Sequence, residues 1–515
     1  ASDVYKRQIL NNPPGNVTLI FMRPRDFLFA PSGALEKRAF RVATPMQYSK
    51  FVAVFQATNP RGNIRMRLHL LKAVPFALAA SFVQAQTLPE AMQDAVKNHP
   101  EIQAAINARI AADYQVREAQ GGYLPKVDLL GGYGRESSDN TSTRAASNSH
   151  DWKTLNRGES TIRLQQNLFQ GFGTVNEVGR QQATANSRGY ALLNTSERTA
   201  LTVAQVYLDV LTRREMVQLA EDNLKSHERI FDQIKLRTSR GVGRMADMDQ
   251  AEARLAQAQN NLITEQTNLA DANTNFLSVV GKEPDQLERP MGIVTALPAS
   301  LDEARRAMIA DSPVLRSAES DIAAAEKQYE AAKSTFYPRF DAVLQRSANN
   351  NIGGEEGHDN GYSAMLNMQF NLYNGGSDKA SLQSKASQAT QALDIRNNAL
   401  RQLNEELGLA WNAYNNASQQ VPIAQQYVDR STKVRTSYQQ QFSLGERTLL
   451  DLLDSENELF TAQQRLAQIK SLYVYTQYRI KADMGQLLRS QGVVAPMASV
   501  VQNDIKPSVN LPGMN

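Results

Sequence analysis

The sequence predicts a mainly α-helical protein with a membrane β-barrel portion, built from a duplicated helix–strand–strand–helix–helix repeat. Three observations lead to this prediction. The two halves of the chain share residues at a constant spacing, short segments alternate apolar and polar residues over a length that crosses a bilayer, and long segments carry a seven-residue apolar repeat. Because one copy holds only four such strands, we expect several copies to assemble.

The segments before residue 86 are expected to be absent from the mature protein. Residues 66–85 have the features of a secretory signal peptide, with Arg67 and Lys72 before an apolar run. A signal peptide normally begins a protein, so we interpret residues 1–65 as an extraneous upstream segment. Twelve of the 56 Lys and Arg, but only three of the 52 Asp and Glu, precede residue 86, which leaves the rest with a net charge of −5. Bulk charge therefore gives no argument for a nucleic-acid partner.

Two repeats follow, and residues of the first half recur 204 positions later in the second half. The matched pairs include Gly171 and Gly375, Gly241 and Gly445, Asp247 and Asp451, and Gly281 and Gly485. We therefore expect a first structural repeat over 86–298, a second over 299–489, and a C-terminal tail over 490–515.

Two strands are expected in each repeat, and the clearest is 362–373, where apolar and polar residues alternate with few exceptions. The expected strands are about 125–134, 161–169, 338–347 and 362–373. Each has about 9–12 residues, which suits a tilted strand that crosses a bilayer. Polar loops over 135–159 and 349–361 join the strands of each pair.

A helix is expected before the strands of each repeat, and a long and a shorter helix after them. The expected leading helices cover about 88–121 and 301–335, and the later pairs are 174–239 with 247–281 and 378–441 with 450–489. Apolar residues recur every seven positions, as in Val203, Val210 and Val217, which predicts left-handed coiled-coil packing. Pro422 falls inside the second long helix, where we expect a kink or a break.

Four amphipathic strands are too few to close a barrel, and an open sheet edge cannot face lipid because its backbone groups would be unsatisfied. Two copies would give about 8 strands and three would give about 12, and only the larger number leaves room for an aqueous bore. The polar strand faces would line this bore. The same symmetry would place the long helices side by side in a coiled-coil α-helical barrel that continues the β-barrel.

Several phrases mark the two repeats, and the corner phrases and the turn phrases among them occupy corresponding places. They are HPEIQAA at 99–105, LFQGFG at 168–173 and LYNGG at 372–376, and the turn phrases GVGRMADMDQAEARL at 241–255 and GERTLLDLLDSENEL at 445–459. Through these phrases and their duplicated order, the chain resembles the TolC family of outer-membrane channels over about 86–489. The resemblance implies a homotrimer with a 12-stranded β-barrel in the outer membrane of a Gram-negative bacterium, with a large periplasmic helical portion.

The phrase NLFQGFGTVNEVGRQQ, together with VYLDVLTRRE at 206–215, resembles the branch of that family that serves type I secretion. This resemblance implies a passive conduit for an exported protein. Its implied partners are a periplasmic adaptor protein, an inner-membrane ABC transporter and the surrounding outer-membrane lipid. The alternative is the outer-membrane component of a tripartite multidrug efflux pump, with an RND-type pump in the inner membrane.

The family resemblance also implies a periplasmic gate at the two turns between long and short helices, over 240–247 and 444–451. Asp451 and Asp454 match acidic positions that ring the constriction. Two acids in each of three copies would place six carboxylates in a narrow mouth, which favours cation entry and raises their proton affinity. Arg447 matches a basic residue that ties the closed turns together.

The closing network implied by the resemblance is altered in this sequence. Asp247 matches a partner of the basic residue in that network. Phe442 stands where the family pattern has a tyrosine, and Ala246 where it has a threonine. Two hydrogen bonds that close the turns are therefore expected to be missing.

The remaining motifs indicate structure rather than chemistry. Glycines are expected at the strand-to-helix corners (Gly171, Gly173, Gly375 and Gly376) and in the helix turns (Gly241, Gly243 and Gly445). The chain has no cysteine, and its five histidines show no metal-ligand spacing, so we expect no enzyme, cofactor or metal site. A soluble periplasmic coiled-coil scaffold would have no use for four bilayer-length strands, and a secreted enzyme would need a catalytic constellation.

Overall fold

The computed structural model describes residues 85–147, 152–293, 297–502, 506–507 and 509. The expected upstream segment and the expected signal peptide, apart from Ala85, lie outside the described residues. The first repeat contains α1 (Leu88–Asn98), α2 (Pro100–Gln120), β1 (Lys126–Ser138), α3 (Thr141–Ser147), β2 (Lys153–Gln170), α4 (Gly173–Ser239) and α5 (Met245–Val280). The second contains α6 (Leu301–Asp311), α7 (Pro313–Ala332), β3 (Arg339–Asn350), β4 (His358–Gln369), α8 (Ser377–Leu444), α9 (Leu449–Asp483) and α10 (Leu487–Ser490).

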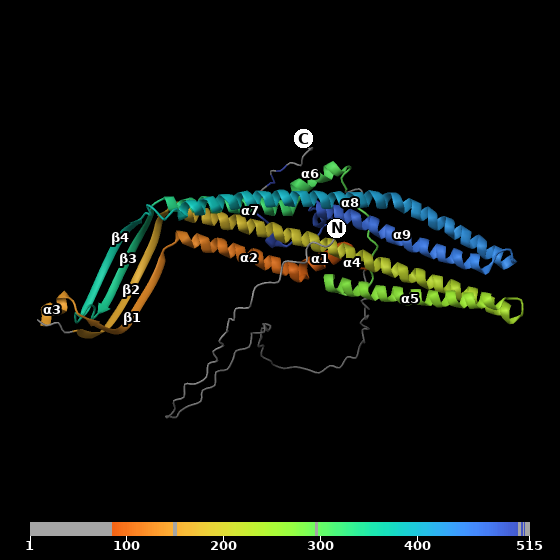
Figure 1. The fold of residues 1–515 in the computed structure, drawn as a ribbon, viewed down its shortest axis with the longest axis horizontal. Helices are drawn as coiled ribbons and strands as arrows, with labels where there is room; N and C mark the ends of the chain where they lie inside the picture. The colour runs from red at the N-terminus through yellow and green to blue at the C-terminus, as the bar shows by residue number, and fades with distance from the viewer. Residues whose placement is uncertain (1–84, 148–151, 294–296, 503–505, 508, 510–515) are drawn as a thin grey trace, which may run out of the picture. The chain divides into compact units, whose positions relative to one another are not determined.

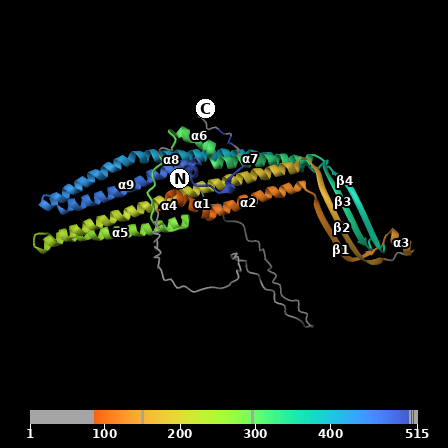
Figure 2. The ribbon, with the colours of Figure 1, turned by 180° about the vertical axis from the view of Figure 1, so that it is seen from behind.

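Apart from α3 in the first half and α10 in the second, the order of helices and strands is the same in both halves, and the prediction of a mainly helical, duplicated fold is confirmed. Figure 1 shows α4 running beside α5 and α8 beside α9, with the strands continuing from one end of the helices. Figure 2 shows the same neighbours from behind. With 67 residues, α4 is about 100 Å long.

The leading helix of each repeat is interrupted, contrary to prediction. The segment 88–121 forms α1 and α2, and the segment 301–335 forms α6, α7 and a 3₁₀ turn, Lys333–Phe336. The breaks fall at His99 and Ser312, whose ψ angles are 129° and 118°. Each residue precedes a proline, which disfavours helical backbone at that position.

Several expected boundaries are wrong, and three of them have a local cause. The loop 135–159 is shorter, because β1 and β2 stay paired as far as Ser138 and Lys153. The strand 362–373 ends at Gln369, because its partner strand β3 begins after Pro338, which has no N–H to donate. The helix 450–489 ends at Asp483, and a short α10 follows Gly485, whose φ is +70°.

Pro422 does not break α8, which runs from Ser377 to Leu444. Figure 1 shows only a gradual curve over the second half of the helix. Val428 on α8 packs with Leu459, Ala462 and Leu466 of α9, beyond the proline. This packing outweighs the single backbone hydrogen bond that the proline removes.

The strands form one antiparallel sheet in the order β1-β2-β3-β4. The register aligns like residues on each face. One row contains Val127, Leu164, Leu344 and Ala364, and the next row, on the opposite face, contains Asp128, Arg163, Gln345 and Ser363. The sheet therefore has one apolar face and one polar face. Exposed apolar side chains of the first face include Leu129, Tyr133, Ile162, Tyr362, Leu366 and Met368.

The largest apolar core lies where α1, α4, α5, α9 and α10 meet. Tyr207 is fully buried there, and its hydroxyl donates to the carbonyl oxygens of Gln86 and Glu288 over 2.7 and 2.6 Å. A second core joins α6, α7, α8 and α9, and a third lies near the helix turns. Among the described residues, no helix is both long enough and apolar enough to cross a bilayer.

Candidate functional site at the helix turns

The turn between α8 and α9 holds several of the predicted site residues. Gly445 ends α8 with a φ of +83°, which glycine adopts without a steric penalty. Thr448 then caps α9: its hydroxyl donates to Oδ2 of Asp451 over 2.8 Å and accepts the backbone N–H of Asp451. The carboxylate also accepts the backbone N–H of Thr448. This reciprocal capping box fixes the start of α9.

Arg447 is held within its own hairpin. Its Nε donates to Oε1 of Gln441 over 3.0 Å, and its Cζ lies 4.4 Å from the centroid of the Tyr438 ring. Its Nη1 is 3.8 Å from Oδ2 of Asp451. Asp247 lies in the first turn of α5, and its side chain makes no hydrogen bond or ion pair with any described residue. Within one protomer, Arg447 is thus paired with Asp451 and not with Asp247.

The two acidic residues of this turn have different surroundings. The hydrogen bond from the Thr448 hydroxyl lowers the pKa of Asp451, and the Arg447 charge acts in the same direction. The surroundings of Asp451 within one protomer therefore favour its ionised form, whereas the expected rise in proton affinity concerns the ring of six carboxylates in a trimer. Asp454 is exposed, and its Oδ1 lies 3.2 Å from Nη2 of Arg254 on α5. That ion pair links the two hairpins.

Phe442 is buried at the end of α8, where it packs with Ile230 and Ile234 of α4 and with Leu449 of α9. The guanidinium of Arg237 lies over its ring, with Cζ 5.0 Å from the centroid. A phenylalanine thus joins α8 to α4 through apolar packing and a cation–π contact, which needs no hydroxyl.

The turn between α4 and α5 relies on glycine rather than on side-chain caps. Gly241 has a φ of +75°. A Cβ on Gly243 would lie 2.6 Å from the hydroxyl oxygen and 2.9 Å from the backbone nitrogen of Thr238. Arg244 occupies the N-cap position of α5 without a side-chain hydrogen bond, and Ala246 is exposed beside it. This turn therefore has fewer fixed contacts than the turn between α8 and α9.

The strand-to-helix corners also contain the predicted glycines. Gly171, Gly375 and Gly376 have positive φ angles, whereas Gly173 begins α4 and does not. A Cβ on Gly171 would lie 2.7 Å from the carbonyl oxygen of Ser334, so only glycine allows this close approach. Phe172 also has a positive φ, +65°, at a cost of about 1–2 kcal/mol for a residue with a side chain.

A family model described as outer membrane efflux protein matches residues 91–282 and 305–486, one segment in each repeat. The chain belongs to this family. Outer membrane efflux protein BepC of Brucella suis is 25% identical over 410 residues, which cover 79% of this chain and 87% of BepC. Alkaline protease secretion protein AprF of Pseudomonas aeruginosa is 23% identical over 76% of this chain and 83% of AprF.

The fold agrees with solved members of the family. The crystal structure of the CmeC outer membrane channel of Campylobacter jejuni superposes with a TM-score of 0.67 and 14% identity. The alignment covers 78% of this chain and 86% of CmeC. The resemblance to the TolC family is confirmed. The chain is an outer-membrane protein of a Gram-negative bacterium with a large periplasmic helical portion, and its family consists of channels rather than enzymes.

Sequence reasoning missed two arginines that join the two helix hairpins of this chain. Arg254 lies three residues after Ala251, and Arg237 lies three residues after Ile234, so each flanks an apolar position that faces a neighbouring helix. In coiled coils, long charged side chains at such flanking positions reach the adjacent helix. That positional signal was present in the sequence.

A group of buried carboxylates near α10 was also missed, and we call it the α10 junction (Glu197, Asp483, Gln486 and α10). Glu197 on α4 is 3% exposed and accepts the backbone N–H groups of Leu487 and Leu488 over 2.9 and 3.2 Å. Burial raises its pKa to about 7. Burial also raises the pKa of Asp483 to about 7, against the opposing effect of Arg479.

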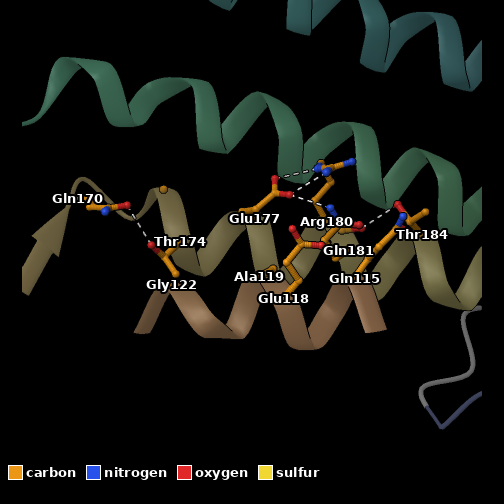
Figure 3. A pocket seen from close by; sticks show the side chains of 11 residues that line it. Gln115, Glu118, Ala119, Gly122, Gln170, Thr174, Glu177, Arg180, Gln181 and Thr184 are labelled. Carbon is orange, nitrogen blue, oxygen red and sulfur yellow. Dashed lines mark hydrogen bonds and ion pairs between the residues drawn. The ribbon is translucent and has the colours of Figure 1, made fainter. Parts of the chain in front are cut away.

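A polar groove lies between α2 and the start of α4 (Figure 3). Its polar residues on α4 bond to one another: Glu177 accepts hydrogen bonds from Arg180 and Gln181. The bond from Arg180 lowers the pKa of Glu177. In the part of the chain that the structure describes, no group of His, Asp and Glu could hold a metal ion. The groove therefore gives no indication of a metal or a cofactor.

Proposed function

We propose that the chain is one protomer of a homotrimeric outer-membrane duct that serves type I secretion. The observation that carries the proposal is the sheet, whose four strands have 13, 18, 12 and 12 residues and whose two faces are apolar and polar. Apolar side chains as exposed as Leu129 and Leu366 (76% and 65%) are costly in water, at about 25 cal/mol per Å². In a bilayer the same face is favourable.

Assembly of three copies accounts for the open edges of the sheet. Within the described chain, β1 and β4 are each paired on one side only. If β1 of one copy pairs with β4 of the next, the 12 strands of three copies close a barrel and no edge faces lipid. The polar face then lines the bore, and α4, α5, α8 and α9 of each copy continue it as a helical barrel into the periplasm.

In this trimer the helix turns form the gate. Asp451 and Asp454 would ring the mouth with six carboxylates, and like charges at several Å repel by about 1 kcal/mol per pair in wet surroundings. Each Asp454 is paired with Arg254 and each Asp451 with Arg447, so both carboxylate charges are partly compensated within a protomer. Arg447, Asp247 and Phe442 would hold the closed arrangement, and Asp247 remains available to a neighbouring copy.

The proposed partners are a periplasmic adaptor protein, an inner-membrane ABC transporter and an exported protein. The family relationship supports an adaptor and an inner-membrane transporter, because TolC-family channels work with such components. The similarity to a protein named for alkaline protease secretion supports protein cargo. The duct itself would be passive and would need no cofactor.

A second candidate function is the outer-membrane component of a multidrug efflux pump with an RND-type transporter. The similarity to a protein named as an efflux protein, at 25% identity, favours it. The two candidates differ in cargo and not in fold.

The test is deletion of the gene in its own host. Type I secretion predicts that one or a few large proteins disappear from the culture medium and return with a plasmid copy. Unchanged medium proteins together with increased sensitivity to several drugs would replace the first candidate with the second. Conductance in planar bilayers, with a reduced cation preference in Asp451→Asn, tests the gate in either case.

A further inference from the structure

The loop between β3 and β4 (residues 351–357, the β3–β4 loop) is packed against the loop of the first repeat. It lies at the end of the sheet away from the long helices, beside α3 (Figure 1), and yet its Gly354 is buried. A Cβ on Gly354 would lie 2.4 Å from Cγ2 of Thr143 on α3 and 3.2 Å from Cβ of Ser138. Thr143 is itself only 4% exposed. The two loops of one protomer therefore form a single packed unit.

Three polar contacts hold the β3–β4 loop to the β1–β2 hairpin. The side-chain amide of Asn140 donates to the carbonyl oxygen of Gly353 over 2.6 Å. The Glu136 carboxylate accepts the backbone N–H of Gly353. Nζ of Lys153 lies 3.6 Å from Oε1 of Glu356. We call these three contacts the loop clasp.

The strand residues of the loop clasp lie on the polar face of the sheet. Glu136 is an even number of residues after Asp128, and alternation along β1 puts both side chains on one face. Lys153 pairs with Ser138, which lies on that same face. Because β2 pairs with β3 only as far as Gly158, the β1–β2 hairpin extends beyond β3. The β3–β4 loop thus crosses the polar side of this extension.

The loop and the strand positions next to it are acidic. Residues 351–359 contain three acids and no Lys or Arg. Asp359 pairs with Asn349, and Asn349 pairs with Glu159, so the two acids share one row of the polar face. A bore lined by the polar face would therefore be negatively charged where the loop crosses it.

We propose that the β3–β4 loop is a lid on the outlet of the duct: it folds over the bore in each protomer, and the loop clasp holds it there. In the trimer, three such loops would narrow the outer end of the bore, so the duct would have a constriction at each end. The inference rests on the proposed barrel, because only there does the polar face enclose a bore. The clasp consists of hydrogen bonds and one exposed ion pair, so cargo in transit can displace the loop.

The test measures how fast thiol reagents reach the bore from outside. Since the chain has no cysteine, Ser363→Cys places a single thiol on the polar face of β4. Intact cells that express the full chain are treated with a small charged maleimide or with the same maleimide on a long polyethylene glycol. Each labelling rate is divided by the rate for the unfolded chain. We expect the bulky reagent to label this thiol more slowly than the small one.

Asn140→Asp combined with Lys153→Gln opens the loop clasp and keeps α3 capped. The aspartate still accepts the backbone N–H of Thr143, as the Asn140 side chain does, but it cannot donate to Gly353. In this background we expect the bulky reagent to label Ser363→Cys roughly fivefold faster, which is the factor that one lost hydrogen bond gives. The rate with the small reagent should stay the same.

Arg144→Gln is the matched control, because Arg144 on α3 bonds to Asp139 and not to the β3–β4 loop. The lid is wrong, and the barrel stands, if the two reagents label Ser363→Cys at equal relative rates in the parent chain. The same holds if Arg144→Gln speeds labelling as much as the open clasp does. If the small reagent never labels Ser363→Cys, even with the clasp open, the polar face lines no bore and the proposed function is wrong.

A thiol on the loop itself decides the question if the open-clasp variant does not reach the outer membrane. Glu355→Cys, once modified with the bulky reagent, should have a lower conductance in planar bilayers. His358→Cys is the control, because His358 lies on the opposite face from Asp359, and its modification should leave the conductance unchanged. Equal changes in the two variants would overturn the lid.

Discussion

The polar contacts at the helix turns and those at the α10 junction differ in exposure. At the turns, the partners Arg254 and Asp454 are 31% and 59% exposed, and such ion pairs contribute about 0–1 kcal/mol. At the α10 junction, Glu197 is buried and accepts two backbone N–H groups. Loss of its carboxylate would leave these N–H groups without an acceptor in a place that water cannot reach. The ion pair between the hairpins can therefore break at little cost while the middle of the molecule stays folded, as the proposed opening at the helix turns would require.

Removing the Glu197 carboxylate should have the largest effect on stability. In Glu197→Ala the N–H groups of Leu487 and Leu488 lose their acceptor, which should cost about 2–4 kcal/mol. The measurement is the temperature at which the assembly dissociates on semi-native gels, together with protease cleavage near α10. Glu197→Gln is the matched control, because its amide oxygen still accepts. Equal losses in both variants would mean that the negative charge and not the acceptor matters.

The buried carboxylates should also make stability depend on pH. The folded-state pKa of Glu197, about 7, is above its value of about 4.5 in an unfolded chain, so the folded state binds the proton more tightly. The stabilisation is present below pH 4.5 and is lost as the pH rises through 7, by roughly 3 kcal/mol. The burial of Asp483 acts in the same direction. We expect a lower dissociation temperature at pH 8 than at pH 5, and a smaller difference in Glu197→Gln.

A change at the capped turn should have a smaller effect. Thr448→Ala removes the hydroxyl that bonds to Asp451 and should cost about 1 kcal/mol. The start of α9 should then open more often, and trypsin should cut after Arg447 faster. Thr448→Ser keeps the hydroxyl and should behave like the parent chain. Unchanged cleavage in Thr448→Ala would show that packing, and not the cap, fixes this turn.

Contacts between neighbouring residues in the chain were predictable, whereas long-range ones were not. The two faces of β4 and the helix–turn–helix order follow from periodicity, since apolar side chains seek one side of each element. Glu197 bonds to backbone groups 290 residues away, and no local pattern encodes such a partner. The break expected at Pro422 is absent because the packing of α8 against α9 outweighs the local preference of proline against helical backbone. The left-handed backbone at Phe172 could not be predicted from the sequence, because phenylalanine disfavours that conformation.

The ion pair between the hairpins should matter least for stability and most for the closed state. Arg254→Gln should lower stability by less than about 1 kcal/mol, because both partners are partly exposed. It also removes the contact that links α5 to α9 and leaves Asp454 uncompensated, so conductance and cation preference in planar bilayers should rise. Arg244→Gln is the matched control, since the Arg244 side chain makes no cap hydrogen bond. If Arg254→Gln destabilised the assembly as much as Glu197→Ala, the turns would be structural anchors like the α10 junction. The difference in exposure between the helix turns and the α10 junction would then not indicate which end of the molecule moves.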